Sequence, residues 1–214
     1  MSIPMFRAAV AAAALPLAAL AAADGTGDLR LGIAYGVATE SDYHLHNAGE
    51  SYERDVDDGE PLRLSAGYVH RFAAAGHSGP IGGLLAFYQQ GPSGLDGPLG
   101  SFDYDLEATS FGFDLIAGYA LALPPRLRLE GVAFGGYYLE QQQLRSATQD
   151  YPLTGDGWEA GLGAALFYAL DERWDLGLDL RYLLLRESDA DFGNGGSELE
   201  STGLLAGLVL AYRL

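Results

Sequence analysis

Four histidines and a large set of carboxylates are the side chains in this sequence that could carry acid–base or metal chemistry. His44 and His46 lie two residues apart among the acidic residues of the segment 40–60. Oxygen ligands grouped in this way can hold a divalent cation, but these carboxylates lack the ordered spacing of a calcium loop. Because acidic segments are usually solvated surface, we expect no metal site here.

The other two histidines do not form a nucleophile and base pair. His70 shares its face of a strand with Tyr68 and Phe72, with no Ser or carboxylate beside it. His77 precedes Ser78 in a short turn, where neighbours in sequence do not point at one another. The chain has no Cys, which excludes thiolate ligands and Cys nucleophiles. We therefore predict a non-enzymatic protein without catalytic residues, metal or cofactor.

The overall charge narrows the class of partner. All 12 basic residues are Arg, and 29 carboxylates give the 214-residue chain a net charge of -17. A nucleic-acid partner requires a basic surface, so this class of partner is excluded. Most of the carboxylates fall in four polar segments, and this distribution favours a cationic or other surface partner there.

The first 23 residues have the composition of a secretory signal peptide. Arg7 is followed by an apolar run from Ala8 to Leu20 and then by three alanines ending at Ala23. The run contains Pro16 and is too short to cross about 30 Å of hydrocarbon. We expect residues 1–23 to be removed and residues 24–214 to form one domain.

Beyond this leader, polar and apolar residues alternate with a period of two, the pattern of strands whose two faces meet different surroundings. From Trp174 to Leu184, for example, Trp, Leu and Tyr alternate with Asp, Gly and Arg. Eight such segments are present, of which the third is the least regular. They are residues 28–37, 62–72, 81–89, 110–121, 127–140, 158–170, 174–184 and 204–214.

The connections between these segments alternate in length. Long polar segments at one end and tight turns at the other, with both termini at the tight-turn end, are typical of outer-membrane barrels. The predicted fold is all-β: an eight-stranded antiparallel transmembrane up-and-down barrel, closed between its first and last strands. The long connections are 40–60, 91–105, 141–156 and 187–198, and the short ones are 73–79, 122–126 and 171–173.

The two strand faces differ in size as well as in polarity. The polar face is rich in Gly, and an eight-stranded lumen is only just wide enough to be filled by side chains. The Trp, Tyr and Leu face is therefore predicted to meet lipid, and the Gly-rich charged face to line the lumen. Buried charges must be paired, so we predict a structural ion-pair network, with a polar path or ligand site as the alternative. Its predicted members are Arg30, Arg63, Arg71, Arg128, Arg181, Asp114, Glu130, Glu159, Asp175 and Asp179.

Aromatic residues cluster toward the strand ends, as in the girdles of membrane barrels, although β-propensity alone also enriches them in strands. The set at the tight-turn end is Phe72, Tyr119, Tyr168, Trp174 and Tyr212. The set at the long-loop end is Phe87, Phe111, Tyr137, Trp158 and Tyr182.

With this topology the chain resembles the small outer-membrane barrels of Gram-negative bacteria, the class of OmpA-like, OmpX-like and OmpW-like proteins. Its last strand, Gly203 to Leu214, is similar to the signal that this class uses for insertion by the barrel-assembly machinery, although members commonly end in Phe. The resemblance implies a place in the outer membrane among its lipids and lipopolysaccharide, with periplasmic termini and extracellular long loops.

Three functions fit this class. We favour a non-enzymatic barrel with a filled lumen and acidic surface loops, in a structural or surface-interaction role. The second function, implied by the OmpW-like proteins, is transport of small hydrophobic molecules through a barrel that opens sideways. The third is modification of lipid A, for which no catalytic set is visible. Apolar residues of inward parity that could line a transport path, or simply pack, are Val132, Phe134, Tyr138, Phe167, Leu183 and Leu185.

Overall fold

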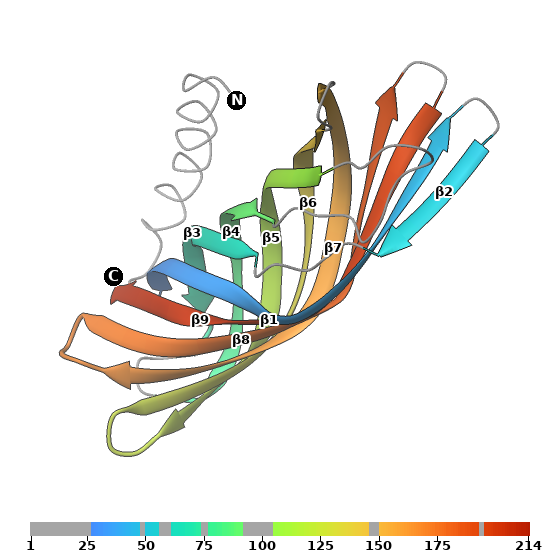
Figure 1. Cartoon of the computed structure of the whole chain (residues 1–214). Coiled ribbons are helices and arrows are strands. Elements are labelled where there is room, and N and C mark those ends of the chain that lie inside the picture. The colour runs from blue at the N-terminus through green and yellow to red at the C-terminus, as the bar shows by residue number, and fades with distance from the viewer. Residues whose placement is uncertain are drawn as a thin grey trace.

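The computed structural model describes residues 27–47, 50–55, 61–73, 77–91, 105–145, 150–192 and 195–214. They form one antiparallel sheet that curves round until β1 pairs with β9 and closes it (Figure 1). No helix in these ranges is long and apolar enough to cross a membrane. The predicted leader lies outside the described residues. The strands are β1 Gly27–Asn47, β2 Glu50–Asp55, β3 Leu62–Arg71, β4 Gly79–Gln90, β5 Asp105–Leu123, β6 Leu127–Arg145, β7 Asp150–Ala169, β8 Trp174–Phe192 and β9 Gly195–Arg213.

The ring has eight strand positions, although nine strands are described. β2 pairs with β1 from Asp42 to Asn47, and β3 pairs with β1 from Gly27 to Tyr35. Because β9 occupies the other edge of β1 along its length, β2 and β3 lie on the same edge and share the second position. The predicted eight-stranded barrel, closed between its first and last strands, is confirmed, and the least regular predicted strand is β4.

Three of the four connections predicted to be long are largely strand instead. β8 continues to Phe192 and β9 begins at Gly195, so most of the predicted loop 187–198 belongs to a paired hairpin. Both faces of these extensions carry polar residues, which removes the contrast on which a period-two pattern depends. The predicted loops that are largely strand are 40–60, 141–156 and 187–198. The three short connections are confirmed.

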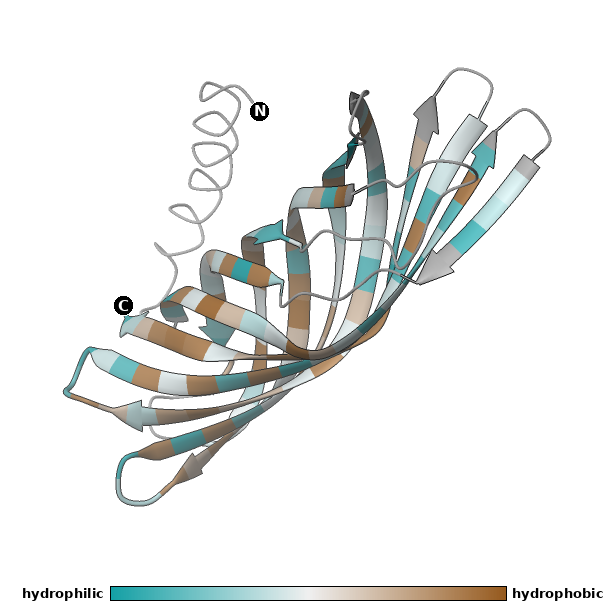
Figure 2. Ribbon diagram, viewed as in Figure 1, coloured by the Kyte–Doolittle hydropathy of each residue, from teal (hydrophilic) through white to brown (hydrophobic). Residues whose placement is uncertain are grey.

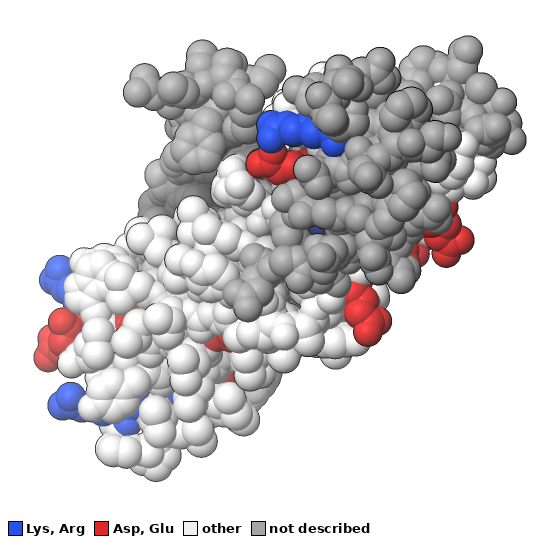
Figure 3. Space-filling view, viewed as in Figure 1, with Lys and Arg blue, Asp and Glu red and all other residues white. Residues whose placement is uncertain are grey.

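The outer and inner faces have the polarity of a membrane barrel. Large apolar side chains of the outer face are exposed, for example Leu178 at 62% and Trp158 at 67%, whereas Arg63 and Asp114 are buried inside. Figure 2 shows the alternation of apolar and polar residues along the strands. In Figure 3, a largely uncharged band separates charged residues near the two ends. A soluble barrel, which keeps its apolar face inside, is excluded.

A β-bulge in β8 reverses the alternation near the middle of that strand. Leu184 and Leu185 together lie between the pairs Leu183–Gly203 and Arg186–Ser201 of β8 and β9. The extra residue turns Leu185 outward, where it is 47% exposed, and turns Arg186 into the lumen. The prediction that Leu185 faces the lumen is therefore wrong.

Gly203 of β9 lies between this bulge and a second one in β1. It pairs with Leu183 of β8 and with Thr39 of β1, directly beyond the β1 bulge at Gly36/Ala38. Its φ of 147° lies in the range that favours glycine, and a Cβ there would overlap the backbone oxygen of Ala38. The backbone conformation between the two bulges therefore requires glycine at this position.

Candidate functional site in the barrel lumen

The inward side chains of β6 give the order of layers along the lumen. Charged layers alternate with apolar layers from the turn end of the barrel toward the strand extensions. The inward residues of β6 follow in the order Arg128, Glu130, Val132, Phe134, Tyr138, Glu140 and Gln142.

The lowest layer, here called the turn-end cluster, is a network of four arginines and three carboxylates. Arg30 donates to both oxygens of Glu130, at 2.7 and 2.9 Å. Asp28 is fully buried and pairs with Arg30, Arg71 and Arg128 at 3.3, 3.0 and 3.0 Å. The cluster thus has one more guanidinium than carboxylates. Its members are Asp28, Arg30, Arg71, Arg128, Glu130, Asp175 and Arg213.

An apolar layer follows, and it contains two of the residues considered for a transport path. Phe134 and Leu183 are 5% and 2% exposed and pack within one buried cluster. Close packing of this kind leaves no room for a ligand beside them. The other buried members are Val69, Ile81, Leu85, Ile116, Ala120 and Leu205.

The next layer, here called the central cluster, crosses the lumen. Arg63 of β3 donates to Asp114 of β5 and to Glu159 of β7, in both cases at 2.6 Å. Arg186 donates to the second oxygen of Glu159 at 2.5 Å. Because β3 and β7 are not neighbours in the sheet, the pair Arg63–Glu159 spans the interior. Members of the central cluster are Arg63, Asp114, Glu159, Asp179, Arg181 and Arg186.

Aromatic rings pack against several guanidinium groups. The Cζ of Arg63 lies 3.7 Å from the ring centroid of Phe87, and that of Arg186 lies 4.1 Å from the centroid of Tyr138. Phe87 is 2% exposed, so its predicted place in the outer aromatic girdle is wrong. Its parity within β4, whose two faces are both apolar, gave no reliable signal.

Above the central cluster, a neutral hydrogen-bonded layer surrounds one carboxylate. Ser188 Oγ donates to Glu140 at 2.6 Å, and Gln142 Nε2 donates to the same carboxylate at 2.9 Å. Ser197 Oγ donates to the amide oxygen of Gln142 at 2.9 Å. An apolar cluster then fills the space between the strand extensions: Tyr43, Leu106, Ala108, Leu153, Ala190 and Leu199.

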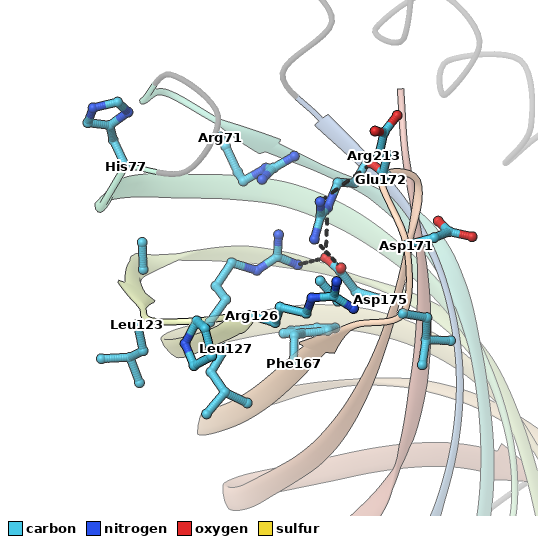
Figure 4. A pocket seen from close by; sticks show the side chains of 15 residues that line it. Arg71, His77, Leu123, Arg126, Leu127, Phe167, Asp171, Glu172, Asp175 and Arg213 are labelled. Carbon is cyan, nitrogen blue, oxygen red and sulfur yellow. Dashed lines mark hydrogen bonds and ion pairs between the residues drawn. The ribbon is translucent and has the colours of Figure 1, made fainter.

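The free volume inside these layers is small. One cavity of about 50 Å³ lies beside Glu140 and Arg186, and another of about 20 Å³ lies beside Arg30 and Arg181. Both spaces are far smaller than the roughly 300–1,000 Å³ of a typical small-ligand site. The turn end, by contrast, opens into a vestibule of about 650 Å³ (Figure 4).

The ten residues predicted to form the lumen network all lie inside the wall and within ion-pair distance of another inward residue. Four further charged members were not in the predicted set. Asp28, Glu140 and Arg213 share the parity of inward neighbours, so alternation could have found them. Arg186 could not be found in this way, because the bulge reverses its parity.

The histidines do not assemble a catalytic or metal site in the described part of the chain. His70 Nδ1 lies 3.0 Å from the hydroxyl of Tyr68, and its ring packs edge-on against Phe72. His46 Nδ1 lies 3.1 Å from Ser51 Oγ. Within the described ranges, no three His, Asp or Glu side chains form a group that could hold a metal ion.

Asp171 organises the turn between β7 and β8 at the rim of the vestibule. Its Oδ1 accepts hydrogen bonds from the backbone N–H groups of Arg173 and Trp174, both at 2.7 Å. These two donors hold the pKa of Asp171 below its ordinary value of 3.8, because they favour the charged carboxylate.

Most of the chain matches a known protein family. A family described as "Outer membrane protein beta-barrel domain" matches residues 8–211. No curated protein matches the chain.

Several solved structures are similar to this chain at low sequence identity, and the similarity to OprG supports the fold. OprG from Pseudomonas aeruginosa is 14% identical, with a TM-score of 0.58 over 89% of this chain and 97% of that chain. Ail of Yersinia pestis is 14% identical, with a TM-score of 0.41 over 88% and 99%. The outer membrane protease OmpT from Escherichia coli is 6% identical, with a TM-score of 0.49 over 87% and 97%. These similarities concern the fold alone.

Proposed function

The chain belongs to the outer membrane protein beta-barrel domain family, and we propose that it is a non-enzymatic barrel with a filled lumen and an acidic extracellular surface. It is an outer-membrane protein, and membrane lipid surrounds its apolar outer band. In this orientation the termini and short turns lie in the periplasm, and the strand extensions project from the cell.

The observation that most strongly supports a filled lumen is that Arg63 reaches across it. Its guanidinium holds Asp114 and Glu159 and packs on Phe87, so it occupies the middle of the interior. An eight-stranded barrel has little room beyond its own side chains. The small cavities above and below this level agree with a closed interior.

The planar-bilayer experiment tests this role directly. Purified protein reconstituted at increasing concentration is expected to give no steady conductance, with a known porin inserted into the same bilayers as the positive control. A steady open current that scales with the amount of protein would contradict the filled lumen.

A lipid A-modifying activity is less well supported. Such an enzyme needs a nucleophile or a base within hydrogen-bond reach of its partner. The described lumen carboxylates are held by arginines, for example Glu130 by Arg30 and Asp175 by Arg213, and His70 contacts Tyr68. These carboxylates serve as ion-pair partners and not as free bases.

Transport of small hydrophobic molecules would need a continuous apolar path. Phe134 and Leu183 are packed in the apolar layer, and Leu185 lies on the outer face of the barrel. The central cluster separates this layer from the apolar residues between the strand extensions. The arrangement therefore favours packing over transport for these residues.

The strand extensions carry two rows of carboxylates on their outer face, here called the acidic rows. The register pairs Asp42 of β1 with Glu200 of β9, and Glu200 with Glu187 of β8. Like charges directly opposite one another destabilise a sheet, so the rows favour cationic partners, or divalent ions that bridge them to lipopolysaccharide phosphates. The second row consists of Glu198, Asp189 and Asp156.

Two measurements test the surface role. Binding of a cationic peptide and of purified lipopolysaccharide with Mg²⁺ is expected to weaken when Glu200→Gln and Asp189→Asn are combined. The matched control is Glu107→Gln, because Glu107 is paired with Arg145 at 3.1 Å and lies outside the rows. Equal binding by both variants would contradict a role for the acidic rows.

We also propose that β9 is the strand recognised by the barrel-assembly machinery. It closes the ring by pairing with β1 from Arg213 to Gly195, and it carries the aromatic Tyr212 opposite Leu29 of β1. Removal of Tyr212, Arg213 and Leu214 is expected to abolish assembly in vivo. Retained heat-modifiable migration of the truncated protein from outer-membrane fractions would contradict this role.

A further inference from the structure

The vestibule at the turn end gathers cationic groups that the filled lumen does not require. Its wall contains the guanidinium groups of Arg71, Arg126, Arg128 and Arg213. Arg126 belongs to the turn between β5 and β6 and makes no ion pair with any residue that the structure describes. Figure 4 shows Arg71, Arg126 and Arg213 around the vestibule, with dashed lines that join Arg213 to Asp175.

The charges at this end do not balance. The turn-end cluster brings four guanidinium groups against three buried carboxylates, Asp28, Glu130 and Asp175, and the exposed Arg126 adds a fifth guanidinium group at the rim. Two more carboxylates line the vestibule, but they lie on the exposed β7–β8 turn, where Asp171 is engaged by backbone N–H groups. The inner wall therefore carries one more positive than negative charge, and a wall of this kind attracts anions.

Arg71 is paired with a single carboxylate among the described residues. Its Nη2 pairs with Asp28 at 3.0 Å, and within the described residues its buried Nε has no hydrogen-bond partner. The planar fork of a guanidinium matches the oxygens of a carboxylate or a phosphate, and several forks around one space favour the group with more oxygens.

Apart from these charged groups and His77, the lining of the vestibule is apolar. Phe167 is 1% exposed, and its ring lies 4.5 Å from the Cζ of Arg128. Leu123, Leu127 and Leu170 also line the vestibule. A volume of about 650 Å³ falls within the usual range of small-ligand sites. Such a lining fits an anionic group that is attached to an apolar or neutral body.

We propose that the vestibule binds a phosphate group through Arg71, Arg126 and Arg213, presented from the periplasmic side by a lipid headgroup or as free phosphate. Both sources offer the same oxyanion to the same guanidinium groups.

The test is calorimetric titration of the full mature protein in neutral detergent with inorganic phosphate. Saturable binding is expected, and Arg126→Gln should weaken it about tenfold, the loss expected for one charge-assisted hydrogen bond. Arg126 is exposed, so heat-modifiable migration should show that the variant folds. Arg145→Gln removes the same charge at the opposite end of β6 and should leave binding unchanged.

A second titration separates the two sources. Tighter binding of dihexanoyl phosphatidic acid than of inorganic phosphate, with the same dependence on Arg126, identifies a lipid headgroup. Equal or weaker binding of the short lipid identifies free phosphate. The proposal is overturned if neither compound binds saturably at millimolar concentration, or if Arg145→Gln weakens binding as much as Arg126→Gln does.

Discussion

Arg63 on β3 and Glu159 on β7 lie 2.6 Å apart across the lumen, although three strands separate them in the wall. Glu159 also holds Arg186 of β8 at 2.5 Å, so a single carboxylate joins three strands. Both partners are almost fully buried. The central cluster therefore acts as a brace across the barrel, and its charges depend on one another.

Removing the central arginine should destabilise the barrel strongly. Arg63→Ala leaves Asp114 and Glu159 short of a partner in a buried site, and we expect a loss of about 3–5 kcal/mol in the free energy of unfolding. Urea unfolding in detergent measures it. Arg145→Ala, which removes an exposed arginine, should cost no more than about 1 kcal/mol. A similar loss in both variants would show that the lumen charges are solvated.

The same class of change at two other lumen arginines should not open the barrel. Arg128→Ala and Arg181→Ala should each destabilise by about 3–5 kcal/mol, yet conductance should stay near zero, because the apolar layer around Phe134 remains packed. Single-channel recording checks the second expectation. A steady current in either variant would show that the arginine itself is the barrier.

Alternation alone identified much of this interior. Arg30, Arg63 and Asp114 stand in regular strands where apolar neighbours mark the opposite face, so their inward direction could be read directly. How these residues pair across the lumen could not be predicted from the alternation. Pairing between distant strands depends on the tilt and stagger of the ring, which no local pattern records.

Arg186 and Phe87 show where the period-two pattern fails. A bulge adds one residue before Arg186, and every side chain after it changes face. Phe87 lies in β4, where small and apolar residues occupy both faces, so parity carries no contrast there. In the strand extensions both faces meet polar surroundings, and hairpins such as β8–β9 therefore resemble loops in sequence.

The bulge predicts opposite effects for two deletions in β8. Deleting Leu184 removes the extra residue, so that Leu183, Leu185 and Arg186 alternate regularly and keep their present faces. We expect this variant to assemble and to migrate heat-modifiably. Deleting Leu178 shifts a regular segment and turns Asp175 or Asp179 toward lipid, so assembly should fail. Equal tolerance of both deletions would contradict the role assigned to the bulge.

The turn at Asp171 predicts a measurable pH dependence. Its pKa is lowered by the backbone N–H groups of Arg173 and Trp174, so the turn gains stability above the ordinary value of 3.8 and loses it as pH falls through the lower folded value. Carbon NMR titration of the carboxyl group should give a midpoint below 3.8, which returns to the ordinary value in urea. A midpoint at or above 3.8 in the folded protein would contradict the hydrogen bonds.

The acidic rows predict that removing a charge stabilises the protein. Glu200 stands between Asp42 and Glu187 in adjacent strands, so Glu200→Gln relieves two unfavourable neighbours at once. We expect a gain of roughly 0.2–1 kcal/mol for each relieved pair at low ionic strength. Added salt should reduce the gain, because it screens exposed charges. Urea unfolding in detergent at low and high salt measures both effects.

Glu40→Gln is the matched control for this gain. Glu40 lies on the same outer face of β1, but its partner in β9 is Thr202, so no opposed carboxylate is relieved. Its stability should therefore stay close to that of the unmutated protein. If Mg²⁺ bridges the acidic rows, its addition should stabilise the unmutated protein more than Glu200→Gln and so narrow the difference between them. Equal gains from both substitutions would assign the effect to net charge, and a loss of stability in Glu200→Gln alone would show that this carboxylate has a favourable partner.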